Sequence, residues 1–448
     1  MQPDAGVRGE DAGHGAVSNT AGALINSDVV VCGGGVTGAM AAVAAARAGA
    51  QVLLIERYGF LGGAATAGAV GQFNCWQTAA GRRVVGGLAD ELVTRLKTYG
   101  GAGEHHTFVM STGHKMDRVE YAPELLKLAL DDLVTQAGVR VLFHAALLDV
   151  SVRGRRIESL RVLTKGGVLT MRPRVVIDAS GDLDAMQQAG ARFLPLDTGE
   201  ALQPATMMFR FGPIDFGQFD AMPGAEKVAL AQRGFAEGHL ARAALHASHN
   251  PFSSDGWFNI GRLAVDATDP FALSAAEMEG RRQGWRASAF LRAHVPGCSE
   301  GKLLAFGTQV GVRETRRVEG DYVLTADDVL RPARFDDAIA AGAYPIDIHA
   351  ASGGGITYQE MGDDHSYQIP YRSLIVRAFD NALVAGRGLS ATHTALAAVR
   401  VMTISMAVGQ AAGTAAALAL RAGVPGNVRE VAMPALRQAL LDAGAYLS

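Results

Sequence analysis

Three glycines, Gly33, Gly35 and Gly38, form the pattern whose chemistry is clearest in this chain. An apolar run at residues 29–31 precedes them and an alanine-rich stretch follows, which predicts a buried strand, a tight turn and a helix. In that setting Gly33 permits the turn, Gly35 lets the main chain approach a pyrophosphate, and Gly38 lets the helix pack closely on the strand.

A carboxylate completes this pattern. Glu56 ends the next apolar run, residues 52–55, about 20 residues after the glycines, where it can accept hydrogen bonds from ribose hydroxyls. Residues 39–48 are strong helix formers, and the helix that they predict directs its first N–H groups at the phosphates. The stretch therefore predicts a dinucleotide site, and by itself it fits NAD and FAD equally.

Arginines crowd one short run, Arg313, Arg316 and Arg317. Planar guanidinium groups are suited to binding carboxylates, so one of these residues could anchor an acidic substrate. Glu314 and Glu319 stand in the same run, however, so structural ion pairing is the other interpretation.

Asp347 and His349 form a second candidate group. An aspartate can orient a histidine that transfers a proton at neutral pH. His365 and further aspartates follow, but their spacing fits no established pattern of metal ligands, so we expect no metal site.

The elements that must position these residues are buried strands followed by glycine. Residues 174–178 and 381–385 repeat the design of the first strand, and residues 150–162 and 167–172 alternate like antiparallel strands. Strands that lead through glycine into helices predict an α/β fold with a parallel sheet.

The domain organisation follows from a change in composition. From about residue 202 aromatic residues and histidines become frequent, which suggests an inserted domain. We expect a leader at residues 1–25, a discontinuous dinucleotide-binding domain at 26–200 and 373–448, and an inserted mixed α+β substrate domain at 201–372.

Composition excludes several classes of protein. Of 448 residues 49% are hydrophobic and 19% charged, and the net charge of −3 provides no general attraction to nucleic acid or anionic lipid. Cys32, Cys75 and Cys298 are too few and too far apart for a disulfide framework or an iron–sulfur cluster, and they point to a reducing, cytoplasmic setting. Residues 401–420 carry no formal charge, but their many small residues favour a core helix over a membrane span.

The glycine-terminated strands, in this order, resemble the FAD-binding domain of glutathione-reductase-like and fumarate-reductase-like flavoproteins. More specifically, residues 27–422 resemble the FAD-dependent oxidoreductase family related to the flavin subunit of heterodisulfide reductase. Besides the first glycine loop, the matching segments are Glu56-Arg57, Leu61-Gly62-Gly63, Ile177-Asp178-Ala179-Ser180-Gly181-Asp182, Asn259 with Arg262, Gly311-Val312-Arg313-Glu314-Thr315-Arg316-Arg317, Gly320-Asp321-Tyr322-Val323-Leu324-Thr325, Ile369-Pro370-Tyr371-Arg372-Ser373-Leu374, Gly386-Arg387-Gly388-Leu389-Ser390-Ala391-Thr392-His393 and Gly409-Gln410-Ala411-Ala412-Gly413-Thr414-Ala415-Ala416.

The resemblance implies a Rossmann-like, glutathione-reductase-like domain of three layers with an antiparallel β-meander, and FAD rather than NAD. The residues that it implies as FAD contacts are Gly33, Gly35, Val36, Thr37, Gly38, Glu56, Arg57, Gly62, Gly63, Ala64, Ala179, Ser180, Gly181, Gly386, Arg387 and Gln410. Where covalent flavoproteins carry a linking histidine, this chain has Phe60 and Leu61, so we expect FAD to be bound non-covalently.

The same resemblance places the flavin ring near His393, which could be a general acid or base or a buried core histidine. We expect a soluble FAD-dependent dehydrogenase or reductase that exchanges a hydride between flavin N5 and a small organic substrate. His393 or His349 would handle the proton, and Arg313 or Arg316 would bind an acid group. The alternative is an electron-transfer subunit.

For partners, we expect a small-molecule substrate and neither nucleic acid nor membrane. A second copy of the chain and an electron-accepting protein remain open as macromolecular partners.

Overall fold

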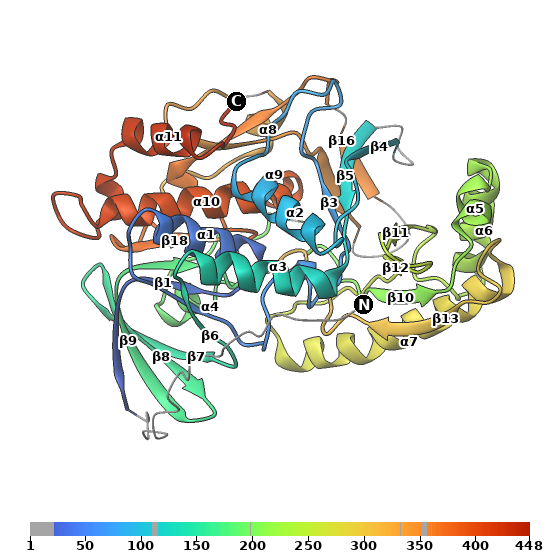
Figure 1. The fold of residues 1–448 in the computed structure, drawn as a ribbon, viewed down its shortest axis with the longest axis horizontal. Coiled ribbons are helices and arrows are strands. Elements are labelled where there is room, and N and C mark those ends of the chain that lie inside the picture. Colours follow the sequence, from blue (N-terminus) through green and yellow to red (C-terminus); the bar gives the residue numbers. More distant parts are fainter. Residues whose placement is uncertain (1–21, 110–114, 198, 332, 351–355, 360) are drawn as a thin grey trace, which may run out of the picture.

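The computed structural model describes residues 22–109, 115–197, 199–331, 333–350, 356–359 and 361–448. Its largest sheet has the strand order β6-β2-β1-β9-β8-β7, and β18 also pairs with β9 (Figure 1). These strands are β1 (Leu24–Cys32), β2 (Val52–Ile55), β6 (Arg140–Leu142), β7 (Ala146–Arg153), β8 (Arg156–Thr164), β9 (Gly167–Asp178) and β18 (Ala382–Val384).

The parallel strands of this sheet end at one edge. Cys32 pairs with both Ile55 and Asp178, and Asp178 pairs in turn with Val384. Because these are the last residues of β1, β2, β9 and β18, the loops that follow leave the sheet side by side. The three glycine loops and Glu56 therefore meet at the edge where parallel α/β sheets bind ligands.

The strand β9 makes both parallel and antiparallel pairs within the one sheet. Its first residues pair antiparallel with β8, which pairs antiparallel with β7, and its last residues pair parallel with β1 and β18. This confirms the α/β fold class with a parallel sheet and an antiparallel β-meander.

Two helices, α1 (Val36–Arg47) and α10 (Met402–Ala419), pack closely together. A Cβ on Gly409 would lie 2.2 Å from the carbonyl oxygen of Thr37, and one on Gly413 would lie 2.0 Å from that of Ala41, so both positions require glycine. The helix α10 is long and apolar enough to cross a membrane, but 89% of it is buried inside the protein. Its packing is that of a core helix.

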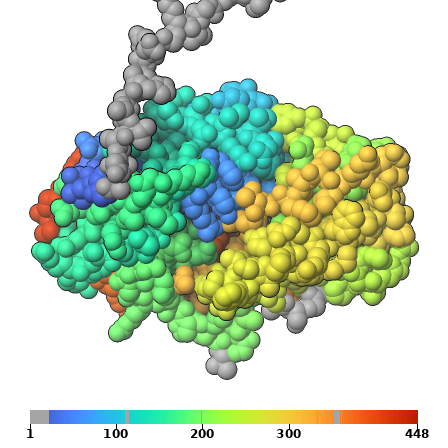
Figure 2. Space-filling model, turned by 90° about the horizontal axis from the view of Figure 1, so that it is seen from below, coloured from blue at the N-terminus to red at the C-terminus, as the bar shows by residue number. Residues whose placement is uncertain are grey.

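The insert builds a second layer of its own, at the right of Figure 1. Its antiparallel sheet has the order β11-β12-β10-β13, and its core contains Phe209, Phe211, Phe258 and Phe290. Figure 2 shows the helix α7 and the strand β13, in yellow to orange, across one side of the surface seen from below. The elements of the insert are β10 (Phe209–Gly212), α5 (Phe216–Ala221), α6 (Gly224–Ala236), β11 (Ala247–His249), β12 (Gly256–Phe258), α7 (Pro270–His294) and β13 (Lys302–Phe306).

The remaining elements complete the main body. They are η1 (Gly63–Ala65), β3 (Gln72–Asn74), α2 (Leu88–Thr98), β4 (His106–Val109), β5 (Lys115–Glu120), α3 (Pro123–Gln136), α4 (Asp184–Gln188), α8 (Ala326–Leu330), β14 (Ala338–Gly342), β15 (Ile346–His349), β16 (Ile356–Gln359), β17 (Tyr367–Pro370), η2 (Tyr371–Ser373), α9 (His393–Val399), η3 (Val428–Glu430) and α11 (Met433–Asp442). Ile339, Tyr367 and Ile369 share the core of α1 and α10, so the domain boundary expected at residue 372 falls within one hydrophobic core.

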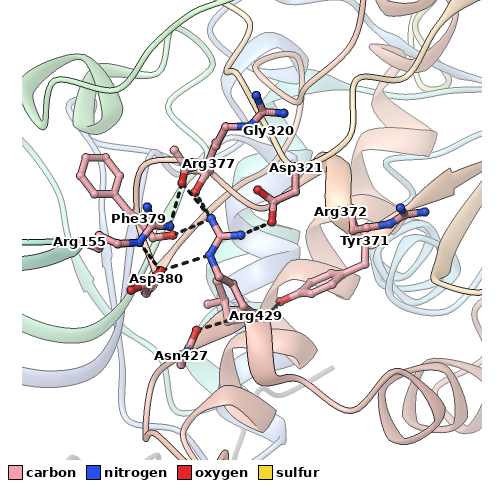
Figure 3. A network of polar contacts seen from close by, with 12 residues as sticks. Arg155, Gly320, Asp321, Tyr371, Arg372, Arg377, Phe379, Asp380, Asn427 and Arg429 are labelled. Carbon is pink, nitrogen blue, oxygen red and sulfur yellow. Dashed lines mark hydrogen bonds and ion pairs between the residues drawn. The ribbon is translucent and has the colours of Figure 1, made fainter.

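A polar clamp fixes the C-terminal segment to the rest of this body (Figure 3). Arg429, in η3, bonds to the carboxylates of Asp321 and Asp380 and to the carbonyl oxygens of Val376, Arg377 and Phe379. Asp380 also accepts a hydrogen bond of 2.9 Å from Arg155, in the turn between β7 and β8. The segment before β18, the β-meander and η3 are thereby held together.

Candidate functional site

A cavity of about 1040 Å³ lies where the glycine loops meet the insert. Its wall on the sheet side includes the first glycine loop, Glu56 and residues 62–64, 179–182 and 385–387. The opposite wall includes residues 242–246, Asn259, residues 308–313, Asp347 and His349. One space therefore joins the residues predicted to bind a dinucleotide to the polar residues of the insert and of β15.

The first glycine loop has the conformation that its motif predicts. Gly33 has a φ of +96°, and a Cβ on it would lie 2.5 Å from the Cα of Ser180. A Cβ on Gly38 would lie 1.9 Å from the carbonyl oxygen of Gly33. Gly35 differs, because its φ of −59° suits any residue and a Cβ would meet only the Cα of Gly63, at 3.9 Å. Its free side faces the cavity, at the start of α1.

A second glycine pair forms the facing wall. Gly62 and Gly63 have φ values of +113° and +55°, and the Gly62 N–H donates to the carbonyl of Gly34 at 2.8 Å. A Cβ on Gly63 would lie 2.9 Å from the Cα of Gly35. The two loops touch through bare main chain, and with Ala64 they line a slot free of bulky side chains.

Glu56 lies at the side of this slot, 7% exposed. Its Oε2 accepts a hydrogen bond of 2.7 Å from the N–H of Gly34, and its Oε1 accepts one of 2.9 Å from the N–H of Tyr58. The main chain thus fixes the carboxylate, and each oxygen keeps a lone pair for a ribose hydroxyl. The guanidinium of the next residue, Arg57, donates to Gln309 Oε1 at 2.6 Å, across to the insert.

The loops after β9 and β18 meet through an ion pair. Arg387 bonds to the carboxylate of Asp182 and donates to the carbonyl of Val312 at 2.9 Å, while its Nε has no partner among the described residues. Beneath them, burial raises the pKa of Asp178 to about 6. The hydrogen bonds that Asp178 accepts from Ser180 and from the N–H of Met186 act in the opposite direction and lower the pKa. Asp178 shapes the loop from within the sheet.

The family model described as "FAD dependent oxidoreductase" matches residues 28–440. The chain belongs to this family of FAD-dependent oxidoreductases. Its cavity fits FAD: two glycine loops leave an open slot, a helix N-terminus and Glu56 border it, and Arg387 offers an unpartnered N–H.

Solved structures resemble the chain at low sequence identity. No curated protein matches the chain. Solved structures include a geranylgeranyl bacteriochlorophyll reductase-like protein from Thermoplasma acidophilum, with 13% identity and a TM-score of 0.44 over 94% of this chain and 83% of that one. The p-nitrophenol 4-monooxygenase from Pseudomonas putida has 10% identity and a TM-score of 0.45 over 94% and 84%. A flavoprotein/dehydrogenase from Cytophaga hutchinsonii has 15% identity and a TM-score of 0.43 over 92% and 83%.

Polar residues of β15 form another part of the wall of this FAD-dependent enzyme's cavity. His349 Nε2 lies 3.4 Å from Asp347 Oδ2, which accepts a hydrogen bond of 2.9 Å from the Tyr344 hydroxyl. Burial and the neighbouring Arg313 lower the pKa of His349 to about 3, so the imidazole is neutral at physiological pH. Burial alone would raise the pKa of Asp347, but His349 and Arg400 hold it below its usual range.

Arg313, one of the two arginines expected to bind an acid group, lines the cavity. It donates to the carbonyl of Pro204 at 2.6 Å and to the Thr206 hydroxyl at 2.8 Å. Burial and the charge of Arg400 lower its pKa to about 9, so it stays charged at neutral pH.

Four predicted site residues lie off the cavity wall, and one of them, Gly38, serves the close packing within the first glycine loop described above. His393 begins α9 and is 4% exposed, with its Nδ1 2.8 Å from Glu314 Oε2. Arg316 donates to the carbonyl of Asp182 at 2.9 Å and stacks on Phe193. Gln410 accepts from the N–H of Leu88 at 2.9 Å and donates to the carbonyl of Ala443. The side chains of His393, Arg316 and Gln410 are bonded to other protein groups, and none of the three lines the cavity.

Sequence reasoning missed two arginines on this wall. Arg242 and Arg400 both line the cavity. Arg242 stands in an irregular segment with no motif around it. Arg400 had a signal, since it is the last charge before the uncharged stretch 401–420 and must lie where that helix leaves the core. Among the described residues no group of three His, Cys, Asp or Glu side chains could hold a metal ion.

Proposed function

We propose that the protein is a dehydrogenase or reductase that transfers a hydride between flavin N5 and a small organic substrate bound beneath the insert. The observation that supports this most is the shared cavity, in which the FAD-binding loops and the polar wall of the insert face one space. Bound FAD supplies the two-electron chemistry, and the chain supplies binding, orientation and proton handling.

The side chains divide these tasks. Arg313 and Arg400 carry the positive charge that holds an acidic group. His349, neutral and oriented by Asp347, can accept a proton from a substrate hydroxyl or amine and return it. The cavity wall is largely apolar elsewhere, with Leu245, Leu273 and Val310 among its residues, and this surface keeps water from the reacting atoms.

The partner that we propose is a small molecule, and the polar residues of the same wall support it. An electron-transfer subunit is the second candidate, supported by the outer face of α7. Phe271, Met278 and Trp285 recur there at every seventh position and are 86%, 49% and 64% exposed. Leu273 of the same helix lines the cavity, so a protein seated on α7 would lie close to the site.

The test is an anaerobic screen of the purified yellow protein. Candidate substrates should bleach the flavin absorbance, and readmitted oxygen or an artificial acceptor should restore it. Protein that binds no FAD, or flavin that no small molecule reduces while a partner protein does, would overturn the proposal.

A further inference from the structure

Arg242 is the least explained charge in the cavity wall. Its guanidinium makes no hydrogen bond or ion pair with any described residue, although the side chain is partly buried and burial lowers its pKa. A partly desolvated cation that faces a cavity gains from a ligand that supplies the opposite charge.

The surroundings increase this excess of positive charge. Arg242, Arg313 and Arg400 all line the cavity, and each acts electrostatically on its neighbours. Asp347 is the one carboxylate that the three share. Of the other cations of the wall, Arg57 is bonded to Gln309 and Arg387 to Asp182. Lys227 lies over the ring of Phe219. Three guanidiniums against one carboxylate leave room for an anion.

Three side-chain oxygens of the cavity-lining residues are buried and have no hydrogen-bond donor among the described residues. Asp347 Oδ1 is buried and accepts no hydrogen bond in the described part of the chain, although Oδ2 is bonded to Tyr344. Asn74 and Asn259 also line the cavity, and the Oδ1 of each is buried without a partner. A buried carboxylate oxygen beside arginines requires an N–H or O–H from the ligand.

We propose that this chamber binds a small organic acid whose carboxylate stands beside a carbon that bears a hydroxyl or amino group. Arg242, with Arg313 and Arg400, receives the carboxylate, and Asp347 Oδ1 receives the O–H or N–H donor. This substrate class rests on the proposed function, because it describes the ligand of the same cavity.

Four compounds on one carbon skeleton test it: 2-hydroxybutanoate, 2-aminobutanoate, butanoate and 2-hydroxybutanamide. Each is titrated into the FAD-loaded protein while the visible absorbance of the oxidised flavin is followed. The hydroxy acid or the amino acid should bind at least about tenfold more tightly than butanoate, and the uncharged amide should give no change. The better of the first two identifies the donor.

Variants assign the contacts. Arg242→Gln should weaken binding of the acids by about tenfold or more with FAD content unchanged, and Arg242→Lys should fall between it and the unmodified protein. Asp347→Ala should remove the preference for the donor-bearing acid, because alanine has no oxygen that can accept its hydrogen bond. Arg282→Gln, on the exposed face of α7 with a side chain 65% exposed, is the matched control and should change nothing.

Equal binding of the amide and the acids, no spectral change with any acid, or unchanged affinity in Arg242→Gln would overturn the proposal. Failure of the proposed function looks different. Acids would then bind with the predicted selectivity, while no small molecule reduced the flavin.

Discussion

His393 and Glu314 are joined inside the protein, with 2.8 Å between His393 Nδ1 and Glu314 Oε2 and side chains only 4% and 0% exposed. The same carboxylate lies 3.3 Å from the guanidinium of Arg317. These contacts tie the arginine run to the first turn of α9. His393 is therefore tied to the segment that follows the cavity-lining residues 308–313, and it is not itself among the lining residues.

Replacing His393 by alanine should lower the free energy of unfolding by about 2–3 kcal/mol, because it leaves a buried carboxylate oxygen without its donor. His393→Asn, whose amide can replace the Nδ1 donor, should recover part of the loss. Urea unfolding measures both. The rate of flavin reduction by a substrate should stay within about twofold, since proton-transfer residues cost about 10²-fold or more. A loss of that size in the rate of flavin reduction, with full FAD content, would mean that His393 takes part in proton transfer.

Two glycines of the first loop should respond differently to the same substitution. Gly35→Val leaves the fold intact, because the φ of −59° suits valine and the side chain enters open space, but that space is the FAD slot. Gly38→Val should prevent folding, since even its Cβ would lie 1.9 Å from a carbonyl oxygen. Circular dichroism and flavin absorbance separate the two outcomes. A yellow Gly35→Val protein would contradict the predicted position of the cofactor.

Sequence could predict the sheet edge because its signals are local. A buried strand, the glycine after it and the following helix lie within a few residues of each other, as at Cys32 with Gly33 and at Val384 with Gly386. Strands of this kind are buried on both faces and must be parallel neighbours, so their loops converge. The FAD side of the cavity follows from that argument.

The substrate side could not be predicted in this way, because its contacts join distant parts of the chain. Gln203 and Arg400 are 197 residues apart, and Glu314 and His393 are 79 apart. Whether an arginine or a histidine faces a cavity depends on which hydrogen-bond acceptors the fold places beside it, and those acceptors come from distant parts of the sequence. Arg242, which no sequence pattern singles out, lines the cavity, whereas His393 does not.

The clamp around Arg429 predicts a large effect far from the site. Arg429→Ala removes contacts to Asp321, Asp380 and three carbonyl oxygens, and should lower the free energy of unfolding by about 2–3 kcal/mol. Arg429→Lys should retain little of this, because one ammonium cannot span the same acceptors. Arg153→Ala is the control, an ion pair with a side chain 83% exposed whose loss should cost less than about 1 kcal/mol. Similar losses of unfolding free energy in Arg429→Ala and Arg153→Ala would mean that the contacts of Arg429 stabilise the protein no more than an exposed ion pair does.

The buried histidines of the cavity predict sensitivity to acid. Burial, with Arg118 near His246 and Arg313 near His349, lowers the pKa of each to about 3 from a usual value of 6.5. Between these values the unfolded chain binds protons that the folded protein does not, so the free energy of unfolding falls as pH falls from about 6.5 towards 3. At pH 5 each histidine should account for about 2 kcal/mol of the lost free energy of unfolding.

Urea unfolding at pH 7 and pH 5 with FAD in fixed excess measures this drop in the free energy of unfolding. The drop should be smaller by about 4 kcal/mol in a His246→Gln, His349→Gln double variant. An equal drop in both proteins would mean that the two imidazoles already bind protons in the folded state.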